Sequence, residues 1–189
     1  MGKKRIVKDS MGTMEVDEAA LYGAQTQRAI DNFPVSGRKM PEEFIRALIL
    51  IKKNAASANA KLGCLDASVT NAISQACDEL LSDDALMVNF PIDVFQTGSG
   101  TSSNMNANEV IASIATRIGG ETIDPNDQVN FGQSSNDVIP TAIHVSARLA
   151  IEQRLKPALL HLINAIEEKA TSVGAVCKTG RTHLMDAMP

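Results

Sequence analysis

The chain has few aromatic residues: it contains no tryptophan and one tyrosine, and aromatic side chains make up 3% of its 189 residues. Its apolar side chains are therefore mainly aliphatic, a composition that favours packed helices over sheets. Hydrophobic residues amount to 44% and charged residues to 21%, as in ordinary globular proteins. A chain of this length can form one good-sized domain, or one domain and part of another.

Cysteine is also scarce. The three thiols, Cys64, Cys77 and Cys177, form neither a C-x-x-C pair nor a disulfide framework. We interpret them as buried thiols in a reducing compartment and expect a cytoplasmic protein. The three histidines are scattered and share no ligand spacing with cysteines or carboxylates, so no metal site is expected.

The sequence lacks the features of nucleic-acid-binding and membrane proteins. Its formal net charge is −4, and it has no basic stripe and no aromatic platform. No apolar run approaches the ~20 residues that a spanning helix needs. The start has neither the apolar stretch of a signal peptide nor the Arg- and Ser-rich pattern of a transit peptide. We therefore expect neither nucleic acid nor a membrane as a partner.

Hydrophobic periodicity predicts a helical protein. The predicted helices cover residues 41–62, 66–81, 105–118 and 140–173. Pro41 suits the first helical position and Gly63 suits the end of the first helix, whereas Pro157 should kink or split the last one. The first forty residues are expected to be irregular, apart from a small hairpin with its turn at residues 10–13.

Three polar stretches are unusual for a helical protein: residues 96–109, 124–137 and 180–186. The first places Gly98 and Gly100 among hydroxyl and amide side chains, before a predicted helix. Glycines let several backbone N–H groups point at one spot, and a helix start adds partial positive charge, so the stretch suits a carboxylate. It is neither a P-loop nor a dinucleotide fingerprint, because no Gly-Lys-Ser/Thr follows and no third glycine is present.

Simpler interpretations exist for each stretch. The first can be an ordinary Ser- and Asn-rich capping loop. In the second, a turn and an N-cap near Asn136 or Asp137 account for everything except the 133–135 run. In the third, His183 can be a general acid/base, or a surface or capping histidine.

Taken together and in this order, the three stretches resemble the signature regions of the fumarase/aspartase superfamily. The resemblance covers essentially the whole chain and rests on residues 22–28, 97–110, 133–142 and 180–187. Within the superfamily the chain is most similar to class II fumarases. His183 follows Arg-Thr where aspartases usually carry Gln, and Ser134-Ser135-Asn136 stands where aspartases tend to read Ser-Thr-Asn.

The resemblance implies an all-α fold. Residues 1–138 would form an N-terminal helical domain that carries the substrate loops and a possible small β-hairpin, and residues 139–189 would begin the central helical bundle. Family members are homotetramers without cofactor or metal, and three subunits build each active site. Their chains are more than twice as long, and the loop with their catalytic serine has no match here. The resemblance therefore implies the N-terminal part of such an enzyme, inactive alone.

The resemblance also implies an activity, the reversible hydration of fumarate to L-malate in the tricarboxylic acid cycle. Loss of the C3 proton of malate builds negative charge on the neighbouring carboxylate, which a preorganised cluster of donors stabilises. The implied substrate-binding donors are Ser99, Thr101, Ser134, Ser135, Asn136 and Thr182. His183 is the implied catalytic residue, and it would hold a water or a substrate carboxylate in another subunit.

A secondary anion site of the family would include Asn126 and Asp127. This chain departs from the family pattern there, since Asp124 stands where fumarases usually have His. Two alternative functions remain open. The parent can be an aspartate ammonia-lyase or another dicarboxylate lyase of the superfamily, or the chain can be a non-catalytic helical module that only binds a dicarboxylate.

Overall fold

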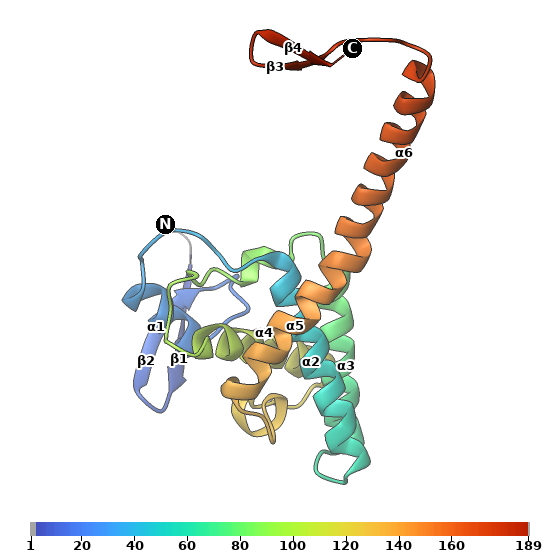
Figure 1. Cartoon of the computed structure of the whole chain (residues 1–189). Coiled ribbons are helices and arrows are strands. Elements are labelled where there is room, and N and C mark those ends of the chain that lie inside the picture. The colour runs from blue at the N-terminus through green and yellow to red at the C-terminus, as the bar shows by residue number, and fades with distance from the viewer. Residues whose placement is uncertain (1–2, 189) are drawn as a thin grey trace. The chain divides into compact units, whose positions relative to one another are not determined.

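The computed structural model describes residues 3–188 and divides the chain into two compact units, Met1–Arg148 and Leu149–Pro189 (Figure 1). The elements of the first unit are β1 (Lys4–Asp9), β2 (Gly12–Asp17), α1 (Ala24–Asn32), α2 (Glu42–Lys61), α3 (Ala67–Ser82), η1 (Leu86–Asn89), α4 (Thr101–Gly119), η2 (Pro125–Val129) and most of α5 (Ser135–Ala150). Those of the second unit are η3 (Ile151–Leu155), α6 (Lys156–Val173), β3 (Gly180–Thr182) and β4 (Met185–Met188). The expected mainly helical fold is confirmed.

The core of the first unit lies where α3 packs against α2 and α4. Aliphatic side chains fill it, as the composition predicted, and full burial of each contributes about 1.5–3 kcal/mol. The fully buried members include Ile45, Leu48, Ile49, Ile73, Leu80, Val110, Ile111 and Ile114. The predicted helices 41–62 and 66–81 agree with α2 and α3 within one residue at each end.

The predicted N-terminal hairpin is confirmed. Strands β1 and β2 pair in antiparallel register from Lys4 opposite Asp17 to Asp9 opposite Gly12. The Asp9 carboxylate accepts a hydrogen bond from the N–H of Met11 in the turn, at 2.9 Å. This is a common way in which an aspartate stabilises a tight turn.

Helix α1 lies in the stretch that was expected to be irregular, so that prediction is wrong there. The residue before the helix is Gly23, which has no side chain to cap it. Glu109 of α4 supplies the cap instead: its carboxylate accepts hydrogen bonds from the N–H groups of Gly23, Gln25 and Thr26 at 2.9, 2.9 and 3.1 Å. Because this partner is more than 80 residues away in sequence, the local sequence does not predict the start of α1.

Helix α4 begins four residues before its predicted start, so part of the first polar stretch is helical rather than loop. Gly100 precedes it in a left-handed conformation, with φ of +69°. The polar side chains of the first turns are buried and find partners outside the helix. For example, Ser103 accepts from the Gln96 side chain at 2.9 Å, and Asn106 donates to the carbonyl of Asn89 at 3.0 Å. These tertiary contacts make a polar sequence helical.

Helix α5 also begins earlier than predicted, at Ser135 rather than Pro140. The carbonyl of Ser134 accepts the first helical bonds, from Asp137 and Val138 at 3.1 and 2.9 Å. Pro140 lies inside the helix, where it removes one hydrogen bond to the preceding turn. The expected interruption near Pro157 takes the form of the π-helical turn η3, after which Pro157 sits in the first turn of α6.

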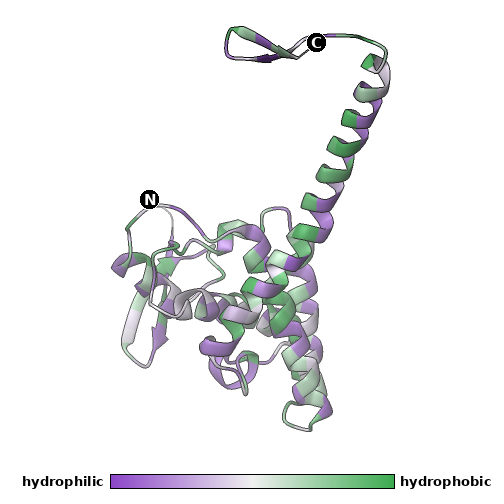
Figure 2. Ribbon diagram, in the orientation of Figure 1, coloured by the Kyte–Doolittle hydropathy of each residue, from purple (hydrophilic) through white to green (hydrophobic). Residues whose placement is uncertain are grey.

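The second unit consists of η3, α6 and the hairpin of β3 and β4. No residue of α6 is buried within the chain, and hydrophobic residues recur along its length (Figure 2). The hairpin occupies residues that were expected to form a loop, so that prediction is wrong. Arg181 pairs with Asp186 across the two strands, through an ion pair of 3.0 Å between Nε and Oδ1.

The cysteines differ in exposure. Cys77 is buried in α3, and burial raises the pKa of its thiol to about 12. Cys64 and Cys177 are exposed and free, so the prediction of buried thiols is wrong for them. Within residues 3–188, no helix is long and apolar enough to cross a membrane.

Candidate functional site

In the first polar stretch, neighbouring side chains cap the start of α4, and the hydroxyl groups of Ser99 and Thr101 take no part in this cap. The side chains of Gln96 and Thr97 accept hydrogen bonds from backbone N–H groups in the first turn of α4, at 2.8 and 3.1 Å. The next two hydroxyl groups, on Ser99 and Thr101, lie 3.3 Å from each other. Capping is thus performed by neighbours, and the two predicted substrate donors remain at the helix start.

A glycine brings this helix start against α5. A Cβ atom on Gly100 would lie 3.1 Å from three carbons of Ile139, which is tighter than ordinary packing. The left-handed backbone at Gly100 also disfavours any residue with a side chain. Because Ile139 is one turn beyond Ser135, the close approach places the starts of α4 and α5 next to each other.

The second polar stretch forms the start of α5. Ser134 accepts the N–H of Asn136 on its hydroxyl at 3.3 Å, and its carbonyl begins the helix. Ser135 is half-buried, and its hydroxyl oxygen accepts a hydrogen bond from Nδ2 of Asn104 at 3.2 Å. Asn104 belongs to α4, so this bond links the two helix starts directly.

Two adjacent helix starts that carry hydroxyl groups make a suitable site for an anion. Each start carries the partial positive charge of a helix N-terminus. Hydroxyl groups add donors whose protons can turn toward carboxylate oxygens. The structure therefore brings together Ser99, Thr101 and Ser135, and keeps Ser134 and Asn136 beside them in sequence.

A buried polar network lies beneath the second stretch, and sequence analysis missed it. Lys52 of α2 is fully buried, and its ammonium group donates to Oδ1 of Asn130 at 2.8 Å and to Oε1 of Gln133 at 2.9 Å. Burial lowers the pKa of Lys52 to about 7. One signal was present in the sequence: Lys52 stands at helical spacing from Ile49 and Ala56, on the apolar face of α2.

A cavity of about 340 Å³ adjoins the first helix start. Its lining includes Thr97 and Thr101, and also Arg28 of α1. Arg28 is paired with Asp9 of β1, at 2.9 Å between NH2 and Oδ1. Burial alone would raise the pKa of Asp9, but hydrogen bonds from Arg28 and from the N–H of Met11 outweigh it, so the pKa lies below its usual range.

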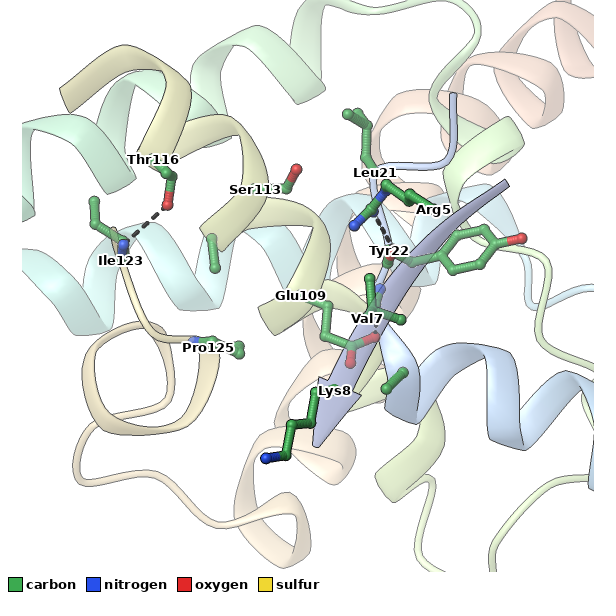
Figure 3. A pocket seen from close by; sticks show the side chains of 13 residues that line it. Arg5, Val7, Lys8, Leu21, Tyr22, Glu109, Ser113, Thr116, Ile123 and Pro125 are labelled. Carbon is green, nitrogen blue, oxygen red and sulfur yellow. Dashed lines mark hydrogen bonds between the residues drawn. The ribbon is translucent and has the colours of Figure 1, made fainter. Parts of the chain in front are cut away.

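A second cavity, of about 350 Å³, lies among β1, α1, α4 and η2 (Figure 3). Its charged lining groups are Arg5, Lys8 and Glu109, and two of them, Arg5 and Glu109, are committed to the fold. Arg5 donates to the carbonyls of Ala20 and Tyr22 at 2.8 and 2.9 Å, and the Glu109 carboxylate caps α1. With these groups engaged, the cavity is a weaker candidate for a ligand than the region at the two helix starts.

The residues of the predicted secondary anion site lie in η2. The N–H groups of Asn126 and Asp127 both donate to Oδ1 of Asp124, at 2.7 and 2.8 Å. Asp124 is the N-cap of this turn. Its carboxylate thus occupies the two backbone donors that a bound anion would use, and the secondary site stays a prediction.

Thr182 and His183 belong to the second unit. Thr182 ends β3, and His183 follows in the turn with a left-handed φ of 55°. Both side chains are exposed. No group of three or more His, Cys, Asp and Glu side chains able to hold a metal ion occurs within the described part of the chain.

Comparisons with known proteins identify the relatives. The sequence is 60% identical to "Fumarate hydratase class II 2" of Pseudomonas aeruginosa over 189 residues, which cover 100% of this chain and 41% of the relative. It is 58% identical to a class II fumarate hydratase of Xylella fastidiosa over 185 residues, or 98% of this chain and 39% of the relative. The chain thus spans about two fifths of the length of these relatives.

Solved structures agree. The crystal structure of class II fumarase from Schistosoma mansoni matches with a TM-score of 0.92 and 42% identity, over 98% of this chain and 40% of that one. A "fumarate lyase:delta crystallin" from Brucella melitensis matches with a TM-score of 0.91 and 44% identity, over 98% of this chain and 44% of that one. The model of the family described as "Lyase" matches residues 12–189. Since that match covers most of the sequence, the chain belongs to this lyase family.

Proposed function

We propose that this chain is the N-terminal part of a fumarate hydratase, which reversibly hydrates fumarate to L-malate. The observation that carries the proposal is the meeting of two helix starts, with Ser99 and Thr101 on one and Ser135 on the other. Relatives named class II fumarate hydratase, at 48–60% identity, support it.

In this proposal the helix starts bind a substrate carboxylate. As the C3 proton of malate leaves, negative charge grows on the neighbouring carboxylate, and donors already aimed at it stabilise that charge. Ser99, Thr101, Ser134, Ser135 and Asn136 are the proposed donors. Loss of one such donor typically costs about 10²–10³ in rate. By the family resemblance, the serine that removes the proton comes from a loop outside this sequence.

We also propose that the intact enzyme is a cytoplasmic homotetramer of the tricarboxylic acid cycle. The apolar surface of α6 supports the assembly, because exposed apolar stripes of this kind are usually covered by partner helices. Five of its large hydrophobic side chains are about half exposed: Leu159, Leu160, Leu162, Ile163 and Ile166. In such an assembly Thr182 and His183 would contribute to the active site of another subunit.

The role of His183 can be tested in the intact enzyme. We expect His183→Asn to lower kcat sharply without changing the fold, because general acid/base or substrate-holding roles are each worth about 10²-fold or more. His161→Asn is the matched control for the loss of an imidazole, since His161 lies in α6 outside the predicted site. Unchanged steady-state kinetics for His183→Asn would show that His183 is a surface or capping histidine without a catalytic role.

Product analysis separates the proposed activity from that of an ammonia-lyase. We expect the intact enzyme to form malate from fumarate without ammonium, measured by NMR of the reaction mixture. Formation of aspartate that requires ammonium, without malate, would contradict the proposal. The chain of residues 1–189 should be inactive alone and gain activity only when mixed with the separately expressed C-terminal portion; a chain that binds dicarboxylate yet never gains activity would favour the non-catalytic module.

A further inference from the structure

We propose that Lys52 is a positioning residue: it fixes the direction of a buried hydrogen-bond chain and thereby keeps the hydroxyl proton of Ser135 available to a bound carboxylate. The chain of bonds runs from Lys52 through Asn130 and Asn104 to Ser135. The inference deepens the proposed function, since it rests on Ser135 being a carboxylate donor.

The direction begins with the amino group of Lys52. As ammonium it can only donate hydrogen bonds, and its neutral form still has two N–H bonds for its two acceptors. Its two partners must therefore turn their amide oxygens toward it, as Asn130 and Gln133 do. Their amide nitrogens point to acceptors in turn. Nδ2 of Asn130 donates to the carbonyl of Gln133 at 3.1 Å, and Nε2 of Gln133 donates to the carbonyl of Val129 at 2.9 Å. Both amides thus have an orientation that their surroundings reinforce.

The next step fixes Asn104. Oδ1 of Asn130 also accepts a hydrogen bond from Nδ2 of Asn104, at 3.2 Å. The same nitrogen donates its second proton to the hydroxyl oxygen of Ser135, at 3.2 Å. Ser135 is therefore an acceptor toward the interior, and its single proton has to point to another partner. At the start of α5, that partner can be an anion.

An unpaired atom supports this direction. Oδ1 of Asn104 is buried and has no hydrogen-bond partner among the described residues, although an unmade bond is unfavourable. Turning the amide over would place this oxygen against Oδ1 of Asn130, acceptor facing acceptor. Because Lys52 holds the oxygen of Asn130 in place, it prevents that rotation, and Asn104 keeps its nitrogen toward Ser135.

Packing alone does not explain Lys52. It stands on the apolar face of α2, near Ile49 and Ala56, where an aliphatic residue would avoid burying a charge. Within residues 3–188 no salt bridge to Lys52 exists, so its charge is compensated by neutral amide oxygens alone. Burying this charge is unfavourable, and its only hydrogen-bond partners among the described residues are the amides of Asn130 and Gln133, so orienting these amides is the role that fits Lys52.

The direction itself can be tested on the chain of residues 1–189 by NMR of the Asn104 side-chain amide. In the wild type, both amide protons should resonate and exchange as hydrogen-bonded protons. Lys52→Met, which removes all three donors, should release them, whereas Lys52→Arg, still donor-only, should retain the wild-type signals. Lys53→Met is the matched control on the partly exposed neighbour. Lys52→Gln, whose amide can donate or accept, replaces the Met variant if that variant does not fold.

The consequence for Ser135 is tested in the intact enzyme by a double-mutant cycle on kcat/KM. Lys52→Met should lower kcat/KM by up to about 100-fold, as misplaced groups do. In a Ser135→Ala background it should cause little further loss, because the group it positions is gone. Purely structural damage would instead give independent, additive losses.

The two arms separate the possible failures. Unchanged Asn104 signals in the folded Lys52 variant would overturn the inference. Altered signals with additive kinetic losses would also overturn it, since Lys52 would then not act through Ser135. If Ser135→Ala alone left kcat/KM unchanged, the proposed role of Ser135 as a substrate donor would fail, and the inference would fail with it.

Discussion

Glu109 and Lys52 are both buried in the first unit, and each dictates the direction of the hydrogen bonds around it. Glu109 can only accept, and it receives the N–H groups of Gly23, Gln25 and Thr26, plus the hydroxyl of Thr26 at 2.6 Å. Lys52 donates to both of its partners, which are side-chain amides. A backbone N–H group is always a donor, whereas a side-chain amide can rotate and present either its oxygen or its nitrogen. Glu109 therefore stabilises the start of helix α1, and Lys52 fixes the orientation of the side-chain amides of Asn130 and Gln133.

The largest expected loss of stability is that of replacing Glu109. Glu109→Ala should lower the free energy of unfolding by about 3 kcal/mol, because buried donors and the start of α1 lose a charged acceptor. Urea denaturation measures the loss, and amide hydrogen exchange should locate it in α1 first. Glu109→Gln, which keeps one acceptor oxygen, is the control and should cost less. Equal losses in both variants would mean that the charge matters more than the number of acceptors.

The charge of Lys52 predicts a pH dependence of stability. Burial lowers its pKa from 10.5 to about 7 in the folded chain, so between these values the unfolded chain binds a proton that the folded chain does not. Stability should therefore rise with pH across this window, by up to about 1.4 kcal/mol per pH unit, and the full penalty should be present below pH 7.

The measurement compares urea denaturation of the wild type and of Lys52→Met from pH 6 to pH 10. The difference between the two curves isolates Lys52, since the titratable group that acts on it, Cys77 of α3, has its pKa raised to about 12 and stays protonated in this window. Parallel curves would show that Lys52 remains charged throughout and that the amide oxygens compensate its burial.

A smaller loss of stability is expected from replacing Gly23, one of the residues whose N–H group Glu109 caps. A Cβ atom on Gly23 would lie 2.8 Å from Oε1 of Glu109, so Gly23→Ala must push the carboxylate away from the N–H groups it caps. We expect a loss of about 1–2 kcal/mol, as for a weakened cap. Gly98→Ala, where no atom lies near the added methyl group, is the matched control. Equal stability of both variants would show that the cap tolerates displacement.

The same contrast explains what could be predicted from the sequence. Helices α2 and α3 follow from periodicity because their apolar faces are local patterns. Helix α1 could not be predicted, since its cap comes from a residue 83 to 86 positions away. Glu109 lies in the third turn of α4 and caps another helix, so its position in the sequence does not reveal its role.

The candidate site was predictable only in part. The resemblance supplied Ser99, Thr101 and Ser135, and the structure places their two helix starts side by side. The supporting residues Lys52 and Asn104 were not predicted, because a lysine in an amphipathic helix usually belongs to the solvated face. Only its position on the apolar face of α2 distinguishes it, and that position gains meaning from partners that lie 78 and 81 residues away.

The smallest predicted effect concerns Lys53, the partly exposed neighbour of Lys52 on the same helix. Lys53 forms an ion pair with Asp78 of α3, and both side chains are about one third to more than one half exposed. Water and salt screen such pairs, so Lys53→Met should change the free energy of unfolding by about 0.5 kcal/mol or less, and 1 M salt should abolish the effect. Urea denaturation at low and high salt measures both. The Lys52→Met effect should persist in salt, because mobile ions do not reach a buried group. If salt weakened the two effects alike, Lys52 would be interacting with solvent-accessible charges rather than with the amides of Asn130 and Gln133.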